Sequence, residues 1–190
     1  ELANGVREGL ISEQDAVAII IVLVGAAGES TSSLVGSAIR ILAENSDLQQ
    51  QLRERPKLIE RYVEEVVRLE SPFKGHYRAV LKETQLAGVT IPASARVFLS
   101  WAAANRDPAV FTAPDRLDMA RENTGEHLGF GHGIHFCIGA RLARMEARVI
   151  LEELLQSTST FCLDSRFSVA HVPSIFVRRL AELQLKVSSN

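Results

Sequence analysis

The feature that most constrains this chain is a glycine-rich loop that ends in a cysteine and runs directly into a helix. The loop covers residues 129–139, with glycine at four of its eleven positions. The helix that follows is indicated by apolar residues with a period of 3.6, at Ile138, Leu142, Met145 and Val149. Cys137 therefore lies at a helix N-terminus, where unpaired N–H groups and the helix dipole favour a negative charge such as a thiolate.

Two interpretations of Cys137 follow from the residues alone. Most free cysteines are small buried hydrophobic residues. A cysteine at a helix N-terminus is also suited to ligate a metal or act as a nucleophile. The glycines at 131, 133 and 139 allow the backbone to fold tightly and to approach a flat or bulky group beside the sulfur.

The spacing around the cysteine decides between these interpretations. Phe130, Gly133, Cys137 and Gly139 form the pattern F-x-x-G-x-x-x-C-x-G, which resembles the haem-binding loop of the cytochrome P-450 family. The resemblance implies that Cys137 is the axial thiolate ligand of a haem iron, a ligand that favours O–O bond cleavage. It further implies a set of cofactor-binding residues: Cys137, Arg78, His135, Phe130, Gly131, Gly133, Gly139 and Ala26.

A long helix is expected over about residues 13–45, beginning after Ser12 as its N-cap. Its first half is apolar on nearly all sides, so we expect it to be buried through the centre of the fold. In its middle, two glycines and a group of hydroxyl residues interrupt the apolar sequence. These fit either a close helix crossing or hydroxyls that bond to carbonyls one turn earlier and bend the helix to open a groove.

The same segment resembles the oxygen-binding motif of the family, an acid followed by an alcohol. The resemblance implies that Glu29 relays protons and that Ser30 or Thr31 hydrogen-bonds dioxygen or its water. The chain departs from the family here because serine stands where threonine is usual. Serine retains the hydroxyl but lacks the methyl group and the restricted χ1 angle.

A further helix is expected over about residues 56–70 and carries an acid and an arginine at i, i+3, Glu65 and Arg68. Such a pair is usually exposed and contributes well under ~1 kcal/mol. At this distance from the cysteine loop it resembles the structural E-x-x-R pair of the family. Arg116, in Pro-Asp-Arg, matches the third member of that set.

The segment after this helix resembles the part of the family fold that borders the haem and the substrate. The resemblance implies that Arg78 and His135 bind the haem propionates, since a guanidinium offers a planar set of donors to a carboxylate. It implies a substrate pocket formed by Phe73, Lys74, Gly75, His76, Ser174 and Ile175. Three arginines on the helix after the cysteine, Arg141, Arg144 and Arg148, are either a solvated face or a docking patch for an acidic ferredoxin or flavodoxin-type electron donor.

Composition fits a globular protein of one large or two small domains. The 190 residues carry a net charge of −2, which gives no reason to expect nucleic acid. The two cysteines form no C-x-x-C motif and predict no disulfide framework, so we expect a reducing, cytoplasmic location. The longest apolar run, residues 16–27, is shorter than the ~20 residues that a membrane span needs.

A zinc site is the alternative chemistry for this part of the chain. His127, His132, His135 and Cys137 lie within eleven residues, and all are zinc ligand types. Their spacing matches no common zinc module, and zinc leaves the Glu29, Arg68 and Arg78 motifs unexplained.

The resemblance predicts a fold that is mainly α with a small antiparallel β portion, the C-terminal part of the P-450 fold over residues 1–190. Its main parts are the helix at about 13–45, the helix at about 56–70, and the cysteine loop with its helix at about 129–156. The implied function is that of a bacterial haem-thiolate monooxygenase that hydroxylates or epoxidises a small organic substrate with dioxygen. The N-terminal half of the family fold is absent, so the chain is alternatively a split half that needs its complement or a second copy, or a non-catalytic, haem-free binding module.

Overall fold

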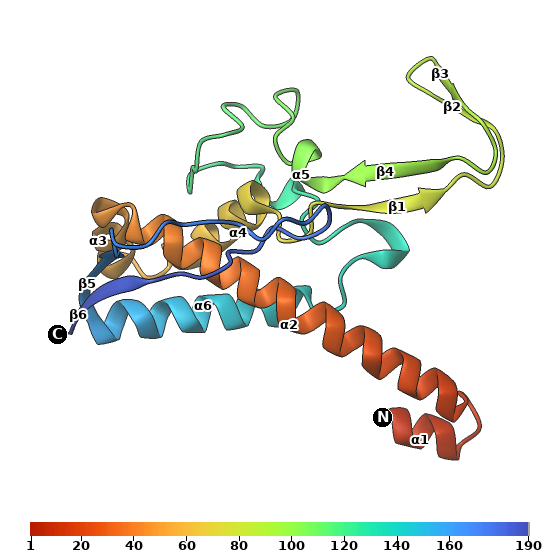
Figure 1. Cartoon of the computed structure of the whole chain (residues 1–190), viewed down its shortest axis with the longest axis horizontal. Helices are drawn as coiled ribbons and strands as arrows, with labels where there is room; N and C mark the ends of the chain where they lie inside the picture. Colours follow the sequence, from red (N-terminus) through yellow and green to blue (C-terminus); the bar gives the residue numbers. More distant parts are fainter. Residues whose placement is uncertain (190) are drawn as a thin grey trace.

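The computed structural model describes residues 1–189 as a helical body with three small two-stranded sheets (Figure 1). The helices are α1 (Leu2–Arg7), α2 (Glu13–Ala43), α3 (Ser46–Glu54), α4 (Leu58–Glu70), α5 (Trp101–Ala104) and α6 (Ala140–Ser157), with 3₁₀ turns η1 (Thr124–Glu126) and η2 (Gly133–His135). The strands are β1 (Gly75–Ala79), β2 (Thr84–Leu86), β3 (Val89–Ile91), β4 (Arg96–Ser100), β5 (Thr158–Leu163) and β6 (Leu185–Ser189). The predicted fold class, mainly α with a small antiparallel β portion, is confirmed.

The long helix α2 begins where the sequence predicts. The Ser12 side chain accepts a hydrogen bond from the Asp15 amide, and the Asp15 carboxylate accepts one from the Ser12 amide. This capping box satisfies donors that the first turn of a helix otherwise leaves free. The helix then continues without interruption through its glycine and hydroxyl segment to Ala43.

The expectation that α2 is buried through its apolar first half is wrong for this chain. Only the second half lies in the core, where Leu34, Ala38 and Leu42 are almost completely buried. The first half extends away from the body together with α1 (Figure 1), and Val22 is 67% exposed. Among residues 1–189 only the short helix α1 packs against the first half, and most of its apolar side chains stay exposed.

The core lies where α2, α4 and α6 pack against one another, with α3 and β5 closing one end. The interior face of α4 contributes Ile59, Val63 and Val66, the three positions expected from its periodicity. Tyr62, also buried, donates its hydroxyl to the Ala38 carbonyl at 2.6 Å. That bond satisfies a buried polar group and fixes α4 against the second half of α2.

The sheets are short antiparallel pairs. Strand β1 pairs with β4 from Gly75 opposite Ser100 to Ala79 opposite Arg96, and β2 pairs with β3 around a tight turn at Gly88. Near the C-terminus, β5 pairs with β6. The β1–β4 hairpin matters for the site because it carries His76 and Arg78 on one strand and leads into α5 from the other.

By length and composition alone α2 is long and apolar enough to cross a membrane. This differs from the expectation based on the continuous apolar run at residues 16–27, which is too short to do so. The mostly buried central helix of a soluble protein meets the same criteria, although only 11% of the apolar window of α2 is buried among residues 1–189. The second half of α2 lies in the protein core, so we interpret α2 as a structural helix of this fold.

Candidate functional site

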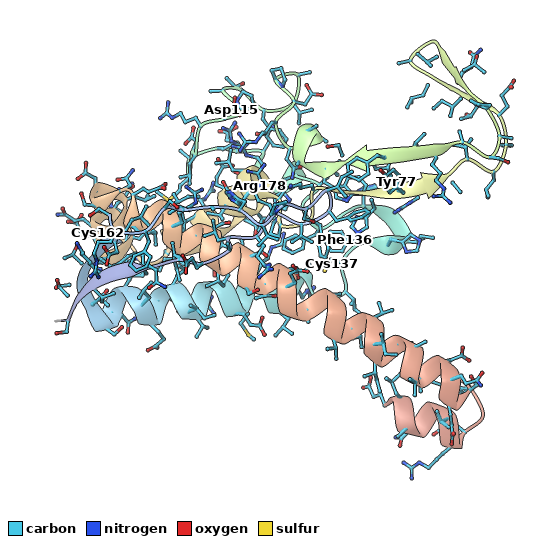
Figure 2. The ribbon with its side chains drawn as sticks, in the orientation of Figure 1. Tyr77, Asp115, Phe136, Cys137, Cys162 and Arg178 are labelled. Carbon is cyan, nitrogen blue, oxygen red and sulfur yellow. The ribbon has the colours of Figure 1, made fainter. Side chains whose placement is uncertain are left out.

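The cysteine loop folds tightly and presents its sulfur at the surface of a cavity. Gly131 and Gly133 have φ values of +73° and +74°, a region that glycine adopts without strain. The Cys137 amide donates to the Phe130 carbonyl at 2.9 Å, which closes the loop on itself. Figure 2 shows Cys137 on this loop beside α2; its thiol is free and exposed.

A large cavity lies between this loop and the middle of α2. Its volume is about 1,220 Å³, above the roughly 300–1,000 Å³ typical of small-molecule pockets. Ala26 to Ser32, without Glu29, line one side and residues 129–132 with Cys137 line the other. Several residues proposed from the sequence are thus brought together around one space: Ala26, Ser30, Thr31, Phe73, His76, Arg78, Phe130, Gly131, His135, Cys137 and Gly139.

The hydroxyls in the middle of α2 form the bonds to carbonyls one turn earlier that one of the two interpretations predicts, within an uninterrupted helix. Ser30 donates its hydroxyl to the Ala26 carbonyl at 2.6 Å, one turn earlier, and Ser33 donates to the Glu29 carbonyl at 2.5 Å. Because the single proton of the Ser30 hydroxyl is used in this way, the oxygen faces the cavity as an acceptor. Thr31 brings a second hydroxyl residue to the same wall.

Glu29 lies elsewhere than expected. Its carboxylate forms an exposed ion pair with Arg179 at 3.1 Å, and it does not line the cavity. The pair instead connects α2 to the segment that precedes β6.

The edge of the cavity carries cationic and polar side chains. Arg78, on β1, and His135, in η2, both line it. Next to Arg78, His76 accepts a hydrogen bond at its Nδ1 from the Trp101 indole at 3.1 Å. Burial, followed by the nearby Arg78 charge, lowers the pKa of His76. A neutral His76 with Nδ1 as acceptor carries its proton on Nε2.

Trp101 was missed by the sequence reasoning, although it is the only tryptophan in the chain. The expected substrate segments, residues 73–76 and 174–175, do lie side by side. Lys74 donates from its side chain to the Ser174 carbonyl at 2.5 Å, and Phe73 forms a β-bridge with Val177. Phe73 and His76 line the cavity, whereas Lys74, Gly75, Ser174, Ile175 and the loop glycine Gly133 lie outside its lining.

The E-x-x-R pair is fully buried. The Arg68 Nε and Nη2 atoms donate to Glu65 at 2.8 and 3.0 Å, and Glu65 also accepts from the Asp118 amide at 2.8 Å. Burial by itself would raise the pKa of Glu65, but these hydrogen bonds and the charges of Arg68 and Arg121 outweigh it and lower the pKa. A buried carboxylate with several donors is stable in its charged form.

The assignment of Arg116 as the third member of this set is wrong. The guanidinium that reaches Glu65 belongs to Arg121, whose Nε lies 3.2 Å from the carboxylate. Arg116 is exposed and contributes only its backbone carbonyl, which accepts from Arg68 and Arg121. Arg121 also donates to the carbonyls of Thr112 and Ala113, at the turn where Ala113 has a φ of +47°. The sequence feature that could have identified the correct residue is the second arginine, Arg121, five positions after Arg116.

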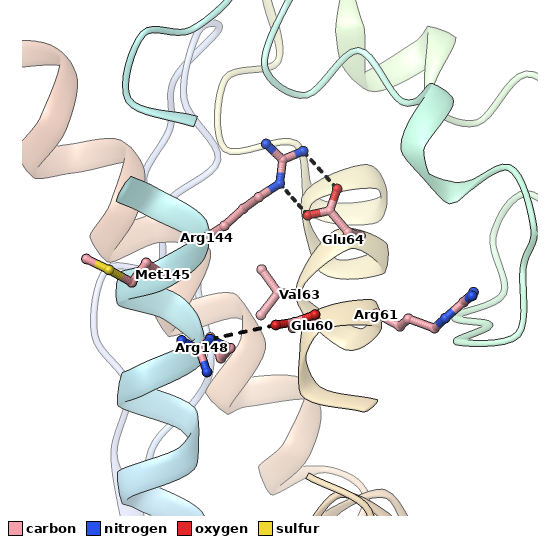
Figure 3. A pocket seen from close by; sticks show the side chains of 7 residues that line it. All are labelled: Glu60, Arg61, Val63, Glu64, Arg144, Met145 and Arg148. Carbon is pink, nitrogen blue, oxygen red and sulfur yellow. Dashed lines mark hydrogen bonds and ion pairs between the residues drawn. The ribbon is translucent and has the colours of Figure 1, made fainter. Parts of the chain in front are cut away.

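Two of the three arginines on α6 are engaged in ion pairs with α4 (Figure 3). Arg144 contacts Glu64 through two bonds of 2.5 and 2.9 Å. Arg148 approaches Glu60 at 4.0 Å. Arg141 is exposed at the start of the helix. The three arginines of the expected docking patch therefore differ: two are paired with acids of α4, and Arg141 is exposed.

The zinc alternative is contradicted by this geometry. Within residues 1–189 there is no group of three or more His, Cys, Asp and Glu side chains that could hold a metal ion. His127 is buried and bonded to Glu64 at 3.1 Å, whereas Cys137, His132 and His135 face the cavity. Cys137 is thus the only thiol among the residues that line the cavity.

Comparison with known proteins agrees with this arrangement. The family profile described as "Cytochrome P450" matches residues 3–166. The chain is 44% identical to "Cytochrome P450 144" of Mycobacterium tuberculosis over 98% of this chain and 43% of the relative. It is 37% identical to the "Biotin biosynthesis cytochrome P450" of Bacillus subtilis over 96% of this chain and 46% of the relative.

Solved structures give the same result. The tirandamycin C-bound P450 monooxygenase TamI superposes with a TM-score of 0.93 at 34% identity, covering 98% of this chain and 48% of that one. A substrate-free cytochrome P450 of Mycobacterium marinum gives a TM-score of 0.90 at 34% identity, covering 92% and 45%. The chain thus spans just under half the length of these proteins.

Proposed function

Because the chain belongs to the cytochrome P450 family, we propose that it is the haem-binding part of a monooxygenase with Cys137 as the axial ligand. The observation that carries the proposal is one large cavity with a single free thiol on one wall and hydroxyls on the opposite wall. Haem held by a thiolate supplies dioxygen activation, since the thiolate pushes electron density toward the iron.

The residues present fit such a cofactor. The cavity is larger than a typical small-molecule pocket, as a large ring requires. Gly139 lies close to the sulfur, since a Cβ at this position would be 3.8 Å from Cys137 Sγ. Arg78 and His135 at the cavity edge are suited to hold the two propionate carboxylates.

On the α2 side, Ser30 and Thr31 are the residues that we propose to hold a proton or water next to dioxygen. The Ser30 oxygen is then available to accept a hydrogen bond from a water in the cavity, while its own O–H donates to the Ala26 carbonyl. Glu29 relays protons only after it releases Arg179. Ser30 and Thr31 are thus the hydroxyl residues of α2 at the cavity wall, and Glu29 is the exposed acid beside them.

The substrate class that we propose is a small organic molecule that is hydroxylated or epoxidised. Related structures hold molecules as different as testosterone and tirandamycin C, so the family alone does not narrow the choice. Phe73 and His76 border the substrate side of the cavity. The cysteine usage favours a cytoplasmic location.

Electrons are proposed to come from a separate ferredoxin or flavodoxin-type protein that docks near the exposed Arg141. Charge reversal by Arg141→Glu is expected to slow reduction, and the effect should decrease as ionic strength rises, because exposed charges act mainly on the association rate. The measurement is stopped-flow reduction over a series of salt concentrations. Unchanged reduction rates at every salt concentration would exclude Arg141 from docking.

A second candidate is a split half that acts only after association with the remainder of the fold. The exposed apolar first half of α2 favours it, because side chains such as Ile21 and Val24 are 66% and 70% exposed, and contiguous exposed apolar side chains mark interaction sites. In this case the isolated chain takes up no haem, and addition in trans of the N-terminal part of a relative restores uptake.

The test is the carbon monoxide difference spectrum of the dithionite-reduced chain after haem loading. The proposal expects the red-shifted Soret band of a haem-thiolate, lost in Cys137→Ala and retained in Cys162→Ala. Cys162 is a matched control because it is also free and exposed but lies in β5. A red-shifted band that survives in Cys137→Ala would refute the proposed ligand.

A further inference from the structure

The side chain of Glu64 lies at the junction between α4, α6 and the segment that enters the cysteine loop. Arg144 binds both of its carboxylate oxygens, with Nε at 2.5 Å and Nη2 at 2.9 Å (Figure 3). His127 Nε2 lies 3.1 Å from the Oε2 atom. One carboxylate therefore joins residues from three separate parts of the chain.

The hydrogen bonds of His127 determine which of its nitrogens carries the proton. The Gly129 amide donates to His127 Nδ1 at 3.1 Å, so Nδ1 is an acceptor. The proton of the neutral ring is then on Nε2 and is donated to Glu64. The His127 ring thus connects the Glu64 carboxylate to the backbone of the cysteine loop at Gly129.

Phe130 is the point at which this arrangement reaches the cysteine. The Arg144 guanidinium lies over the Phe130 ring, 4.3 Å from its centroid, and the His127 ring lies 5.8 Å from the same ring. The carbonyl of Phe130 accepts the Cys137 amide at 2.9 Å. Movement of Phe130 would therefore also move the backbone that orients the sulfur.

We propose that Glu64, His127 and Arg144 form a positioning network that fixes Phe130 and thereby the backbone of Cys137. Arg144 is then a positioning residue of the cysteine loop, and the docking of an electron donor is left to Arg141. The inference deepens the proposed function, since the loop that is positioned is the one that carries the proposed ligand.

The neighbouring pair one turn along α6 shows how this network differs from an ordinary surface contact. Arg148 and Glu60 are 4.0 Å apart, and the Glu60 side chain is 75% exposed. The Glu64 carboxylate has two bonds to one guanidinium and a third to a histidine side chain that is only 2% exposed. Bidentate arginine–carboxylate pairs have a defined geometry, whereas single exposed pairs constrain little.

The experiment measures the cysteine loop directly in the chain without haem. Amide hydrogen exchange is followed at Gly129 and Cys137, and thiol alkylation of Cys137 is measured relative to Cys162 in the same molecule. Glu64→Gln and Arg144→Met are each expected to accelerate exchange of the Cys137 amide by about ten-fold or more, because its acceptor is released. Core amides of α4 and α6 keep their wild-type rates.

Two further variants separate positioning from charge. Arg144→Lys keeps the charge but loses the planar fork of donors, so we expect it to leave the loop nearly as exposed to exchange as Arg144→Met. Arg148→Met, on the same helix, is the matched control and should change loop exchange by less than about two-fold. Wild-type exchange rates in Arg144→Lys would mean that the charge of residue 144, and not the planar geometry of its donors, holds the cysteine loop in place.

Two outcomes overturn the proposal. Loop exchange and Cys137 alkylation within two-fold of wild type in Glu64→Gln and Arg144→Met would show that the network does not position the loop. A uniform rise of exchange across the whole chain in both would assign it to general stability. Haem uptake by the wild-type chain is recorded separately; a lack of uptake counts against the proposed function and leaves the exchange result unaffected.

Discussion

Replacement of Arg121 by methionine tests which arginine completes the buried E-x-x-R set. Arg121 donates to the Glu65 carboxylate at 3.2 Å and to the Thr112 carbonyl at 2.7 Å. It also lies over the buried Phe111 ring, 5.9 Å from its centroid. Methionine keeps an apolar chain against that ring and removes every one of these donors.

The expected loss of stability depends on which partners the Glu65 carboxylate keeps in the variant. Removal of one partner from a buried ion pair costs about 3–5 kcal/mol, because the other charge stays buried. Glu65 still has Arg68 in Arg121→Met, so we expect the lower end, a decrease of about 3 kcal/mol in the free energy of unfolding. For a chain of this size that corresponds to a decrease of roughly 6–12 °C in Tm.

The assay is urea unfolding followed by far-UV circular dichroism, with Arg116→Met as the matched control. Arg116 supplies its backbone carbonyl, which the substitution keeps, so its effect should stay within about 0.5 kcal/mol. The reasoning is refuted when the two variants are equally stable, or when Arg116→Met is the less stable of the two.

Two further predictions concern the cysteine loop and its support. A Cβ at Gly129 would lie 2.5 Å from the Val67 side chain, so Gly129→Ala should lower stability by about 1–3 kcal/mol through overpacking; Gly125→Ala, in open space, should have little effect in the same thermal scan. Burial raises the pKa of Glu64, but the hydrogen bonds from Arg144 and His127 and the charge of Arg144 outweigh it and lower the pKa to about 2 from 4.5. Because the folded pKa is the lower one, the stabilisation of roughly 3 kcal/mol is present above about pH 4.5 and is lost as the pH falls through 2. Urea unfolding at pH 7 and pH 3 should show a smaller pH dependence in Glu64→Gln, and an equal dependence would contradict this assignment.

Local sequence signals predicted much of the site because they depend on neighbours in the chain. The turn residues Gly131 and Gly133, the capping Ser12 and the hydroxyl of Ser30 act within one turn, so spacing alone locates them. The burial of Glu65 and Arg68 was not predictable in this way. An i, i+3 pair looks the same in sequence whether it faces water or the core.

Two of the residues that sequence reasoning misplaced depend on the direction that a side chain takes after a turn or along a helix. Arg121 rather than Arg116 enters the core because of the chain path after Ala113. Glu29 turns away from the cavity toward Arg179. The direction of such a side chain is determined by contacts between segments that meet only in the folded chain.

The sequence by itself determined the fold class, the family pattern around Cys137 and the helix that carries Ser30. These rest on periodicity and fixed spacing along the chain, which persist without tertiary contacts. Only the tertiary structure decided that one cavity joins Cys137 to Ser30. It also decided that Arg144 pairs with Glu64, because the two residues are 80 positions apart in the chain and meet only where α4 packs against α6.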